Sequence, residues 1–387
     1  MSLRKIFFWL HLCAGTTAGV VILMMSVTGV LLTYERQMIA WADRSFRIPT
    51  LPLSPARVPI EVLIAEVQEA ENALPASLLV RSDPAAPVEA SFGRERTLFL
   101  DPYTGAVLGE GTKRIRIFFR VVTDWHRWLG QQGERRPIGR AITGAANLVF
   151  LFIVMSGLYL WWPRRWSARN LRSVTLFRGG LTGKARDFNW HNVIGFWSAM
   201  PLFFIVLGGV MISYPWATNL LYRAAGSEPP VPSGLRPAAP PARAPDSSAD
   251  VNLDGMNEAW ATAERQVAGW EAITLRMPVS NSGPLSFTID LAHRGRPDKR
   301  WTISIDRGTG EVVRSESFSE FNRGRKVRTW LRWIHTGEAG GIAGQTIAGI
   351  VSGGGAVLVW TGLALAFRRF RAWRVKRHSK EEVLVEM

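Results

Sequence analysis

The sequence is poor in cysteine and in acidic residues, and each shortage restricts what the protein can be. Cys13 is its only cysteine, which excludes an intramolecular disulfide, a cysteine-ligated iron–sulfur cluster and a zinc finger. Lysine and arginine number 47 against 31 aspartates and glutamates, so the net charge is +16. A charge of this size can indicate nucleic-acid binding, and its meaning here depends on where along the chain it lies.

Four apolar runs are long enough to cross about 30 Å of hydrocarbon. They cover residues 8–34, 141–162, 190–214 and 343–367. Many of the 17 tryptophans flank these runs, as in the aromatic belts of membrane interfaces: Trp9, Trp161, Trp162, Trp190, Trp216, Trp330 and Trp333. The sequence therefore predicts a membrane bundle of four helices with two long water-exposed segments, about 35–140 and 215–342.

The basic residues gather in three short flanks of these runs. The first flank holds Arg4 and Lys5; the others hold Arg164, Arg165, Arg169, Arg172, Arg178, Lys184 and Arg186, and Arg368, Arg369, Arg371, Arg374, Lys376 and Arg377. All three fall on one side of the membrane, which the positive-inside rule makes the cytoplasmic side. We therefore interpret the charge as a topology signal with a possible role in binding anionic membrane lipid, and we expect no nucleic-acid partner.

The chain repeats itself at matched spacings, which predicts an internal duplication. FFWLHLCAG (7–15) opens the first run and FNWHNVIG (188–195) opens the third. In both segments a glycine lies four residues after the histidine, a second glycine lies eighteen residues after it, and a tyrosine lies twenty-three residues after it. GRAITG (139–144) matches GQTIAG (344–349). Thirteen residues after the last glycine of each lies another glycine, Gly157 in SGL and Gly362 in TGL. FLDPYTGAVLGE (99–110) and SIDRGTGEVVRSE (304–316) both predict a strand, a turn and a returning strand.

Four of the six histidines occupy equivalent places in the two copies. His11 and His191 stand at the cytoplasmic ends of the first and third runs, while His126 and His335 stand on the outer side, before the second and fourth. The other two histidines lie in polar stretches and are interpreted as surface residues: His293 and His378. Equal depth predicts two separate sites, one from His11 with His191 and one from His126 with His335.

Two imidazoles per site favour haem over other metal centres. Zinc normally takes four ligands, and no cysteine or inward carboxylate is apparent nearby. Met24 and Met25 lie too deep to complete a copper site with His11. A haem needs only two axial ligands, and its porphyrin is apolar enough for a helix bundle. We therefore predict two haem groups, each held by two histidines.

Glycines lie where flat rings would meet the first and third helices. Gly15 and Gly195 lie one helical turn after His11 and His191. Gly29 and Gly209 lie five turns after the same histidines, or about 27 Å along the helix axis. A simpler interpretation stays open, because an interfacial histidine can be a membrane anchor and a glycine can be a helix-packing contact. Four arginines could face haem propionates or lipid: Arg4, Arg127, Arg186 and Arg332.

Together these motifs resemble the PepSY-associated transmembrane family, also called iron-regulated or iron-uptake membrane proteins. The resemblance rests on HLCAG with TGVLL, LDPYTGAVL, WHRWLG with SGLYLWWPRR, WHNVIGFWSAMPL, and IHTGEAGG with TGLAL. It covers nearly the whole chain, and it implies that His11, His126, His191 and His335 occupy the family's histidine positions. The segment GGIAGQTIAGIVSGGGAV departs from the pattern by its many glycines.

The resemblance implies an inner-membrane protein with b-type haem that reduces ferric siderophores in the periplasm, although many members have no assigned role. No dinucleotide fingerprint or Walker motif is found, so we expect the electron donor to be another protein or a membrane quinol. Two alternatives remain: a non-enzymatic module whose outer domains bind a periplasmic partner, and an electron conduit to another periplasmic acceptor.

The expected fold is a membrane α-helical bundle with two α+β, PepSY-like periplasmic domains. The expected order is a span (1–34), a domain (35–137), a span (138–163), a basic cytoplasmic loop (164–187), a span (188–214), a Pro/Ala-rich linker (215–250), a domain (251–336), a span (337–367) and a basic cytoplasmic tail (368–387).

Overall fold

The computed structural model describes residues 2–49, 56–93, 96–163, 167–230, 252–278, 283–292 and 296–385. The chain divides into two compact units, each built from separate stretches of sequence. The helical unit comprises Met1–Thr33, Val121–Leu220 and Trp330–Met387. The sheet unit comprises Tyr34–Arg120 and Leu221–Thr329. Most of the predicted linker, residues 231–250, lies outside the described residues.

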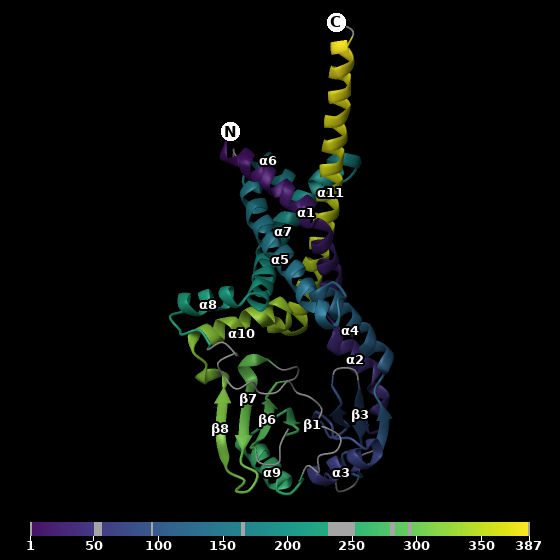
Figure 1. The fold of residues 1–387 in the computed structure, drawn as a ribbon, viewed down its shortest axis with the longest axis vertical. Helices are drawn as coiled ribbons and strands as arrows, with labels where there is room; N and C mark the ends of the chain where they lie inside the picture. The colour runs from purple at the N-terminus through teal and green to yellow at the C-terminus, as the bar shows by residue number, and fades with distance from the viewer. Residues whose placement is uncertain are drawn as a thin grey trace. The chain divides into compact units, whose positions relative to one another are not determined.

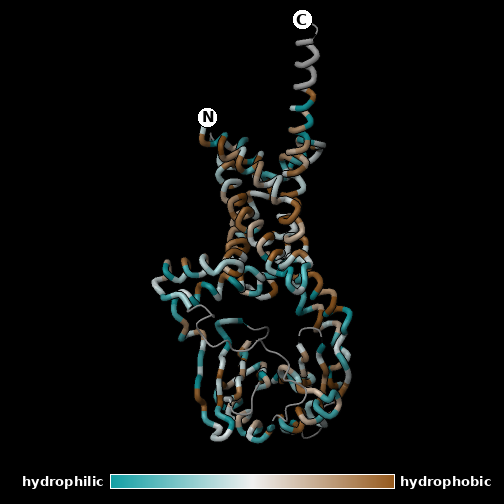
Figure 2. The backbone as a smooth tube through the Cα atoms, in the orientation of Figure 1, coloured by the Kyte–Doolittle hydropathy of each residue, from teal (hydrophilic) through white to brown (hydrophobic). Residues whose placement is uncertain are grey.

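Four long apolar helices form the helical unit (Figure 1). They are α1 (Leu3–Leu32), α5 (Arg136–Trp161), α7 (Gly183–Ser213) and α11 (Gly341–Val385). All four are long and apolar enough to cross a membrane, which confirms the predicted spans. In Figure 2 their tubes are largely brown. α1 packs against α5 and α11, and α7 packs against the same two helices. α1 and α7 therefore stand diagonally opposite each other.

The basic stretches predicted as a loop and a tail contain helix. α6 (Ala168–Thr175) lies in the predicted loop and packs against α7, which itself begins before the predicted boundary. α11 continues without a break through the basic residues to Val385. Arginine and lysine are good helix formers, so an apolar helix can extend into a basic segment once it leaves the hydrocarbon.

Several glycines of α11 lie at close helix contacts. A Cβ added at Gly349 would meet Thr33 of α1 at 3.3 Å, and one at Gly355 would meet Ser26 at 3.1 Å. Gly354 similarly faces Ile194 of α7. Spanning helices pack closely where small residues let their backbones approach. The unusual glycine content of this segment therefore serves packing inside the bundle.

The sheet unit contains one antiparallel sheet of eight strands in the order β4-β3-β2-β1-β5-β6-β7-β8. The first segment supplies β1 (Ser77–Arg81), β2 (Val88–Ser91), β3 (Thr97–Leu100) and β4 (Val107–Glu110). The second supplies β5 (Ala272–Arg276), β6 (Leu285–Asp290), β7 (Arg300–Ile305) and β8 (Val312–Ser317). The predicted turn in each segment joins the last two strands, as expected.

The two segments meet in the middle of this sheet and share one hydrophobic core. β1 pairs with β5, with Leu79 opposite Thr274. α3 (Ile60–Glu71) and α9 (Met256–Gln266) pack on the sheet in a single buried cluster. The sequence predicted two separate domains, but the structure joins the two segments in one unit. An unpaired β1 or β5 would expose an edge of backbone donors and acceptors, and mutual pairing removes that edge.

A helix follows the last strand of each half of the sheet. α4 (Lys113–Trp128) follows β4, and α10 (Arg323–His335) follows β8. Smaller helices complete the fold: α2 (Glu35–Ala42), α8 (Pro215–Ala224) and the 3-10 turns η1 (Arg44–Phe46), η2 (Gly133–Arg135), η3 (Pro297–Lys299), η4 (Phe318–Glu320) and η5 (Glu338–Gly340).

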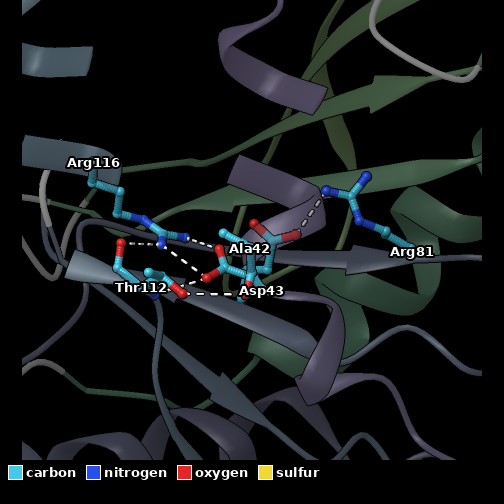
Figure 3. A network of polar contacts seen from close by, with 6 residues as sticks. Ala42, Asp43, Arg81, Thr112 and Arg116 are labelled. Carbon is cyan, nitrogen blue, oxygen red and sulfur yellow. Dashed lines mark hydrogen bonds and ion pairs between the residues drawn. The ribbon is translucent and has the colours of Figure 1, made fainter. Parts of the chain in front are cut away.

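A buried ion pair ties the start of α4 to the end of α2 (Figure 3). Arg116 and Asp43 have side chains only 7 % exposed, and Nη2 of Arg116 lies 2.6 Å from Oδ2 of Asp43. The backbone N–H of Thr112 donates to Oδ1 of Asp43 at 2.8 Å. A Cβ at Gly111 would lie 2.6 Å from Nη1 of Arg116, so glycine there leaves room for the guanidinium. α10 has a more exposed ion pair near its start, between Arg325 and Glu316.

Candidate functional site: two histidine pairs

His11 and His191 face each other from diagonally opposite helices. His11 lies on α1 and His191 on α7, and their ring centres are 6.5 Å apart with the planes at 88°. The structure thus brings together two residues 180 positions apart in sequence. We call them the first histidine pair.

Each ring of the first pair is held by a neighbouring helix. Nδ1 of His11 hydrogen-bonds with Oγ of Ser156 on α5 at 2.9 Å, and Nδ1 of His191 with Oγ1 of Thr361 on α11 at 3.0 Å. A glycine follows each hydroxyl residue and lies against the ring. A Cβ at Gly157 or Gly362 would be 3.3 Å from the Cε1 atom of His11 or His191, closer than ordinary van der Waals contact.

His126 and His335 form the second histidine pair, with ring centres 6.3 Å apart and planes at 54°. His126 lies near the end of α4, and His335 is the last residue of α10. Nδ1 of His126 hydrogen-bonds with Oγ1 of Thr28 on α1 at 2.9 Å. Nδ1 of His335 donates to the backbone carbonyl of Ile205 on α7 at 2.7 Å.

Burial favours the neutral form of both rings in the second pair. Burial lowers the pKa of His126 to about 4, and the neighbouring His335 and Arg127 act in the same direction. Burial also lowers the pKa of His335. A neutral imidazole has one nitrogen lone pair free to bind a metal. Nδ1 of His335 must donate to the Ile205 carbonyl, so in that ring the free lone pair is on Nε2.

The separation of the rings fits one metal ion between two imidazoles. Metal–nitrogen bonds are about 2.0 Å long, so a metal shared by two Nε2 atoms keeps the ring centres about 6 Å apart. Within the described ranges, no group of three or more His, Cys, Asp and Glu side chains could hold a metal ion. Each pair could therefore offer two nitrogen ligands, a number that suits haem better than zinc.

The glycines predicted beside the rings have different surroundings. A Cβ at Gly15 would meet nothing within 4 Å, and one at Gly195 would meet only Leu358, at 3.6 Å. Gly29 lies against the second pair, where a Cβ would be 3.7 Å from Cε1 of His126. At Gly209 the space is filled by the amide of Asn147, 2.9 Å away, so the structure gives this glycine a helix-packing contact.

Sequence reasoning missed the residues behind the rings. It matched Gly157 with Gly362 as part of the repeat but assigned neither to a site, and it overlooked Ser156, Thr361 and Thr28. The signal was present, because a hydroxyl residue precedes the glycine in SGL, TGL and the TG of TGVLL. Gly208 was also missed: a Cβ there would lie 2.6 Å from the carbonyl oxygen of Leu331 and 2.9 Å from Cβ of His335.

Three of the four arginines that could face propionates have protein partners. Arg4 donates to the carbonyls of Leu160 and Trp162 at the end of α5. Arg127 stacks on Trp128, and Arg186 pairs with the buried Asp187. Arg332 is exposed. His293 lies outside the described residues, as does the side chain of His378.

A bundle of four membrane-spanning helices, joined to an α+β unit with an eight-stranded antiparallel sheet, defines a multi-pass membrane protein. The family model for the PepSY-associated TM region matches residues 8–369, and the chain belongs to this family. A search of curated proteins found no match.

Proposed function

We propose that the protein is a di-haem b electron-transfer protein of the bacterial inner membrane that reduces ferric siderophores in the periplasm. The observation that carries this proposal is the presence of two half-buried histidine pairs, with ring centres 6.5 Å and 6.3 Å apart and every Nδ1 hydrogen-bonded. A haem with two imidazole ligands supplies one-electron chemistry and has no open position for oxygen.

The chain's own residues would hold the groups and exclude water. The first pair would bind one haem and the second pair the other, each from two different helices. Between the two pairs the bundle is packed with buried side chains, among them Ile22, Leu202 and Val206. Such packing would keep water from the interior of the bundle.

The internal duplication explains why there are two pairs. Ser156–Gly157 stand behind His11 as Thr361–Gly362 stand behind His191. Asn147 faces Gly209, and Ser352, at the matching position of the fourth span, faces Gly29. Both halves of the sheet unit also follow the order helix and four strands. We infer that a span, a PepSY-like α+β half and a span occur twice.

The charge distribution supports the proposed orientation. Both termini and the segment between α5 and α7 carry the basic flanks. By the positive-inside rule they would lie in the cytoplasm and the sheet unit in the periplasm. A ferric chelate outside would receive one electron, giving ferrous iron that the siderophore holds far more weakly. The electron would come from a quinol or a reduced protein, which is oxidised in turn.

Ferric chelates should re-oxidise the reduced protein. We expect purified protein reduced with dithionite, freed of excess reductant under anaerobic conditions, to return to its oxidised spectrum when a ferric hydroxamate or catecholate siderophore is added. A ferrous-specific dye should detect the released iron. The gallium-loaded siderophore, which has the same shape and cannot be reduced, is the control. If no ferric chelate causes re-oxidation, the protein serves another acceptor.

Crowding of a ring in the first pair should weaken one site. Gly362→Ala places a methyl 3.3 Å from Cε1 of His191, a ring that its bond to Thr361 keeps in place. We expect about tenfold weaker haem retention at this site, measured by the pyridine haemochrome content after dilution. Gly353→Ala, on the same helix with its nearest neighbour at 3.9 Å, should keep both haems; equal behaviour of the two variants would contradict the assignment.

A further inference from the structure

Each of the four histidines has its own hydrogen-bond acceptor behind the ring. We propose that Ser156, Thr361, Thr28 and the Ile205 carbonyl set the reduction potentials of the two haem sites, by holding the proton on Nδ1. This inference rests on the proposed function, because it concerns how the histidines would bind iron.

Each hydroxyl group is placed to accept from its ring, because it also lies within hydrogen-bond distance of a carbonyl of its own helix. The hydroxyl of Thr28 donates to the carbonyl of Met24 at 2.7 Å, and that of Thr361 donates to Val357 at 2.8 Å. Ser156 donates to Ile153 at 3.2 Å. A hydroxyl has one hydrogen and two lone pairs. With the hydrogen committed to the backbone, each oxygen accepts from Nδ1–H, which leaves the lone pair on Nε2.

The fourth acceptor, behind His335, is a backbone carbonyl and not a hydroxyl group. Gly208 stands seventeen residues after His191, as Thr28 stands seventeen after His11. A threonine at 208 could not fit, because a Cβ would lie 2.6 Å from the carbonyl oxygen of Leu331. The Ile205 carbonyl, which can only accept, bonds to Nδ1 of His335 instead. The acceptor is thus present even where the hydroxyl residue is absent.

These bonds are shielded from water, so they should have a large effect on the rings. Ser156, Thr361 and Thr28 are only 2 %, 1 % and 8 % exposed. An acceptor on the far nitrogen of a ligating imidazole orients the ring and makes it a stronger electron donor to the metal. Stronger donation stabilises ferric over ferrous iron and lowers the reduction potential. Hydroxyls that only bonded their own helix would have no such effect.

Removal of one hydroxyl should therefore raise the potential of one site. In a redox titration of the haem-loaded full chain, we expect Thr28→Val to shift the reduction equilibrium of one haem about tenfold, or about 59 mV for one electron. Thr361→Val should shift the other haem by a similar amount. Thr28→Ser and Thr361→Ser keep the hydroxyl and should match the unmodified protein. Ser156→Ala removes a single oxygen and provides a second variant at the first pair.

The outcomes separate this inference from the proposed function. A protein that binds two haems but shows unchanged potentials in Thr28→Val, Thr361→Val and Ser156→Ala would refute the inference alone. Equal shifts of both haems in each variant, or shifts in the serine variants as large as in the valine variants, would also refute it. A protein that binds no haem would refute the proposed function itself.

Discussion

His11→Ala is expected to remove one of two haems and leave the other spectrally intact. The variant takes away one of two axial ligands in the first pair, and His191 alone would hold the group far more weakly. The purified protein should show a Soret band of about half the original intensity per chain, because one of two equivalent chromophores is lost. His191→Ala should have the same effect on the same haem.

The second pair provides the matched control for this experiment. His126→Ala and His335→Ala should remove the other haem, which redox titration and low-temperature α-band spectra can distinguish from the first. If His11→Ala and His126→Ala abolish the same haem, the pairing shown by the ring distances does not describe ligation. A colourless unmodified protein would favour the alternative, in which the family's fold serves as a non-enzymatic membrane module with histidines that only support packing.

Asp43→Ala should destabilise the sheet unit severely. The substitution leaves the Arg116 guanidinium, 7 % exposed, without its carboxylate, and it removes the acceptor of the Thr112 N–H. Loss of one partner of a buried ion pair costs about 3–5 kcal/mol. The unfolding temperature of the sheet unit, followed by tryptophan fluorescence in detergent, should fall by about 10 °C.

An exposed ion pair provides the comparison for Asp43. Arg47 and Asp83 lie 2.8 Å apart with side chains 55 % and 40 % exposed, and such pairs contribute about 0–1 kcal/mol. Arg47→Ala should therefore leave the unfolding temperature nearly unchanged. A drop in Asp43→Ala no larger than that in Arg47→Ala would show that the buried pair does not stabilise the unit. Replacement of both Asp43 and Arg116 by apolar residues should recover part of the loss.

The local sequence pattern predicted the membrane-spanning helices and the strand turns correctly, but it did not predict where the helices begin and end. The four spans are read from apolar run length, and the turn after β3 from its glycine, because both depend on neighbouring residues alone. The ends were less clear: α7 begins at Gly183 and α11 continues to Val385. A helix ends where its caps and packing end it, and hydropathy reports neither.

The eight-stranded sheet could not be predicted from either segment alone. β1 and β5 are separated by nearly two hundred residues, and nothing in their local sequences distinguishes a strand that stays at an edge from one that pairs with a distant partner. Strand pairing depends on which edges remain unpaired once the chain has collapsed. The sequence therefore suggested two domains where the structure has one core.

Repeat spacing and charge asymmetry by themselves determined which histidines belong together. They placed His11 with His191 and His126 with His335, because equal position in a repeat and equal depth in the membrane are properties of the linear chain. Tertiary structure alone decided what surrounds the rings. Ser156, Thr361, Thr28 and the Ile205 carbonyl come from helices distant in sequence, and only helix packing brings a particular oxygen within 3 Å of each Nδ1.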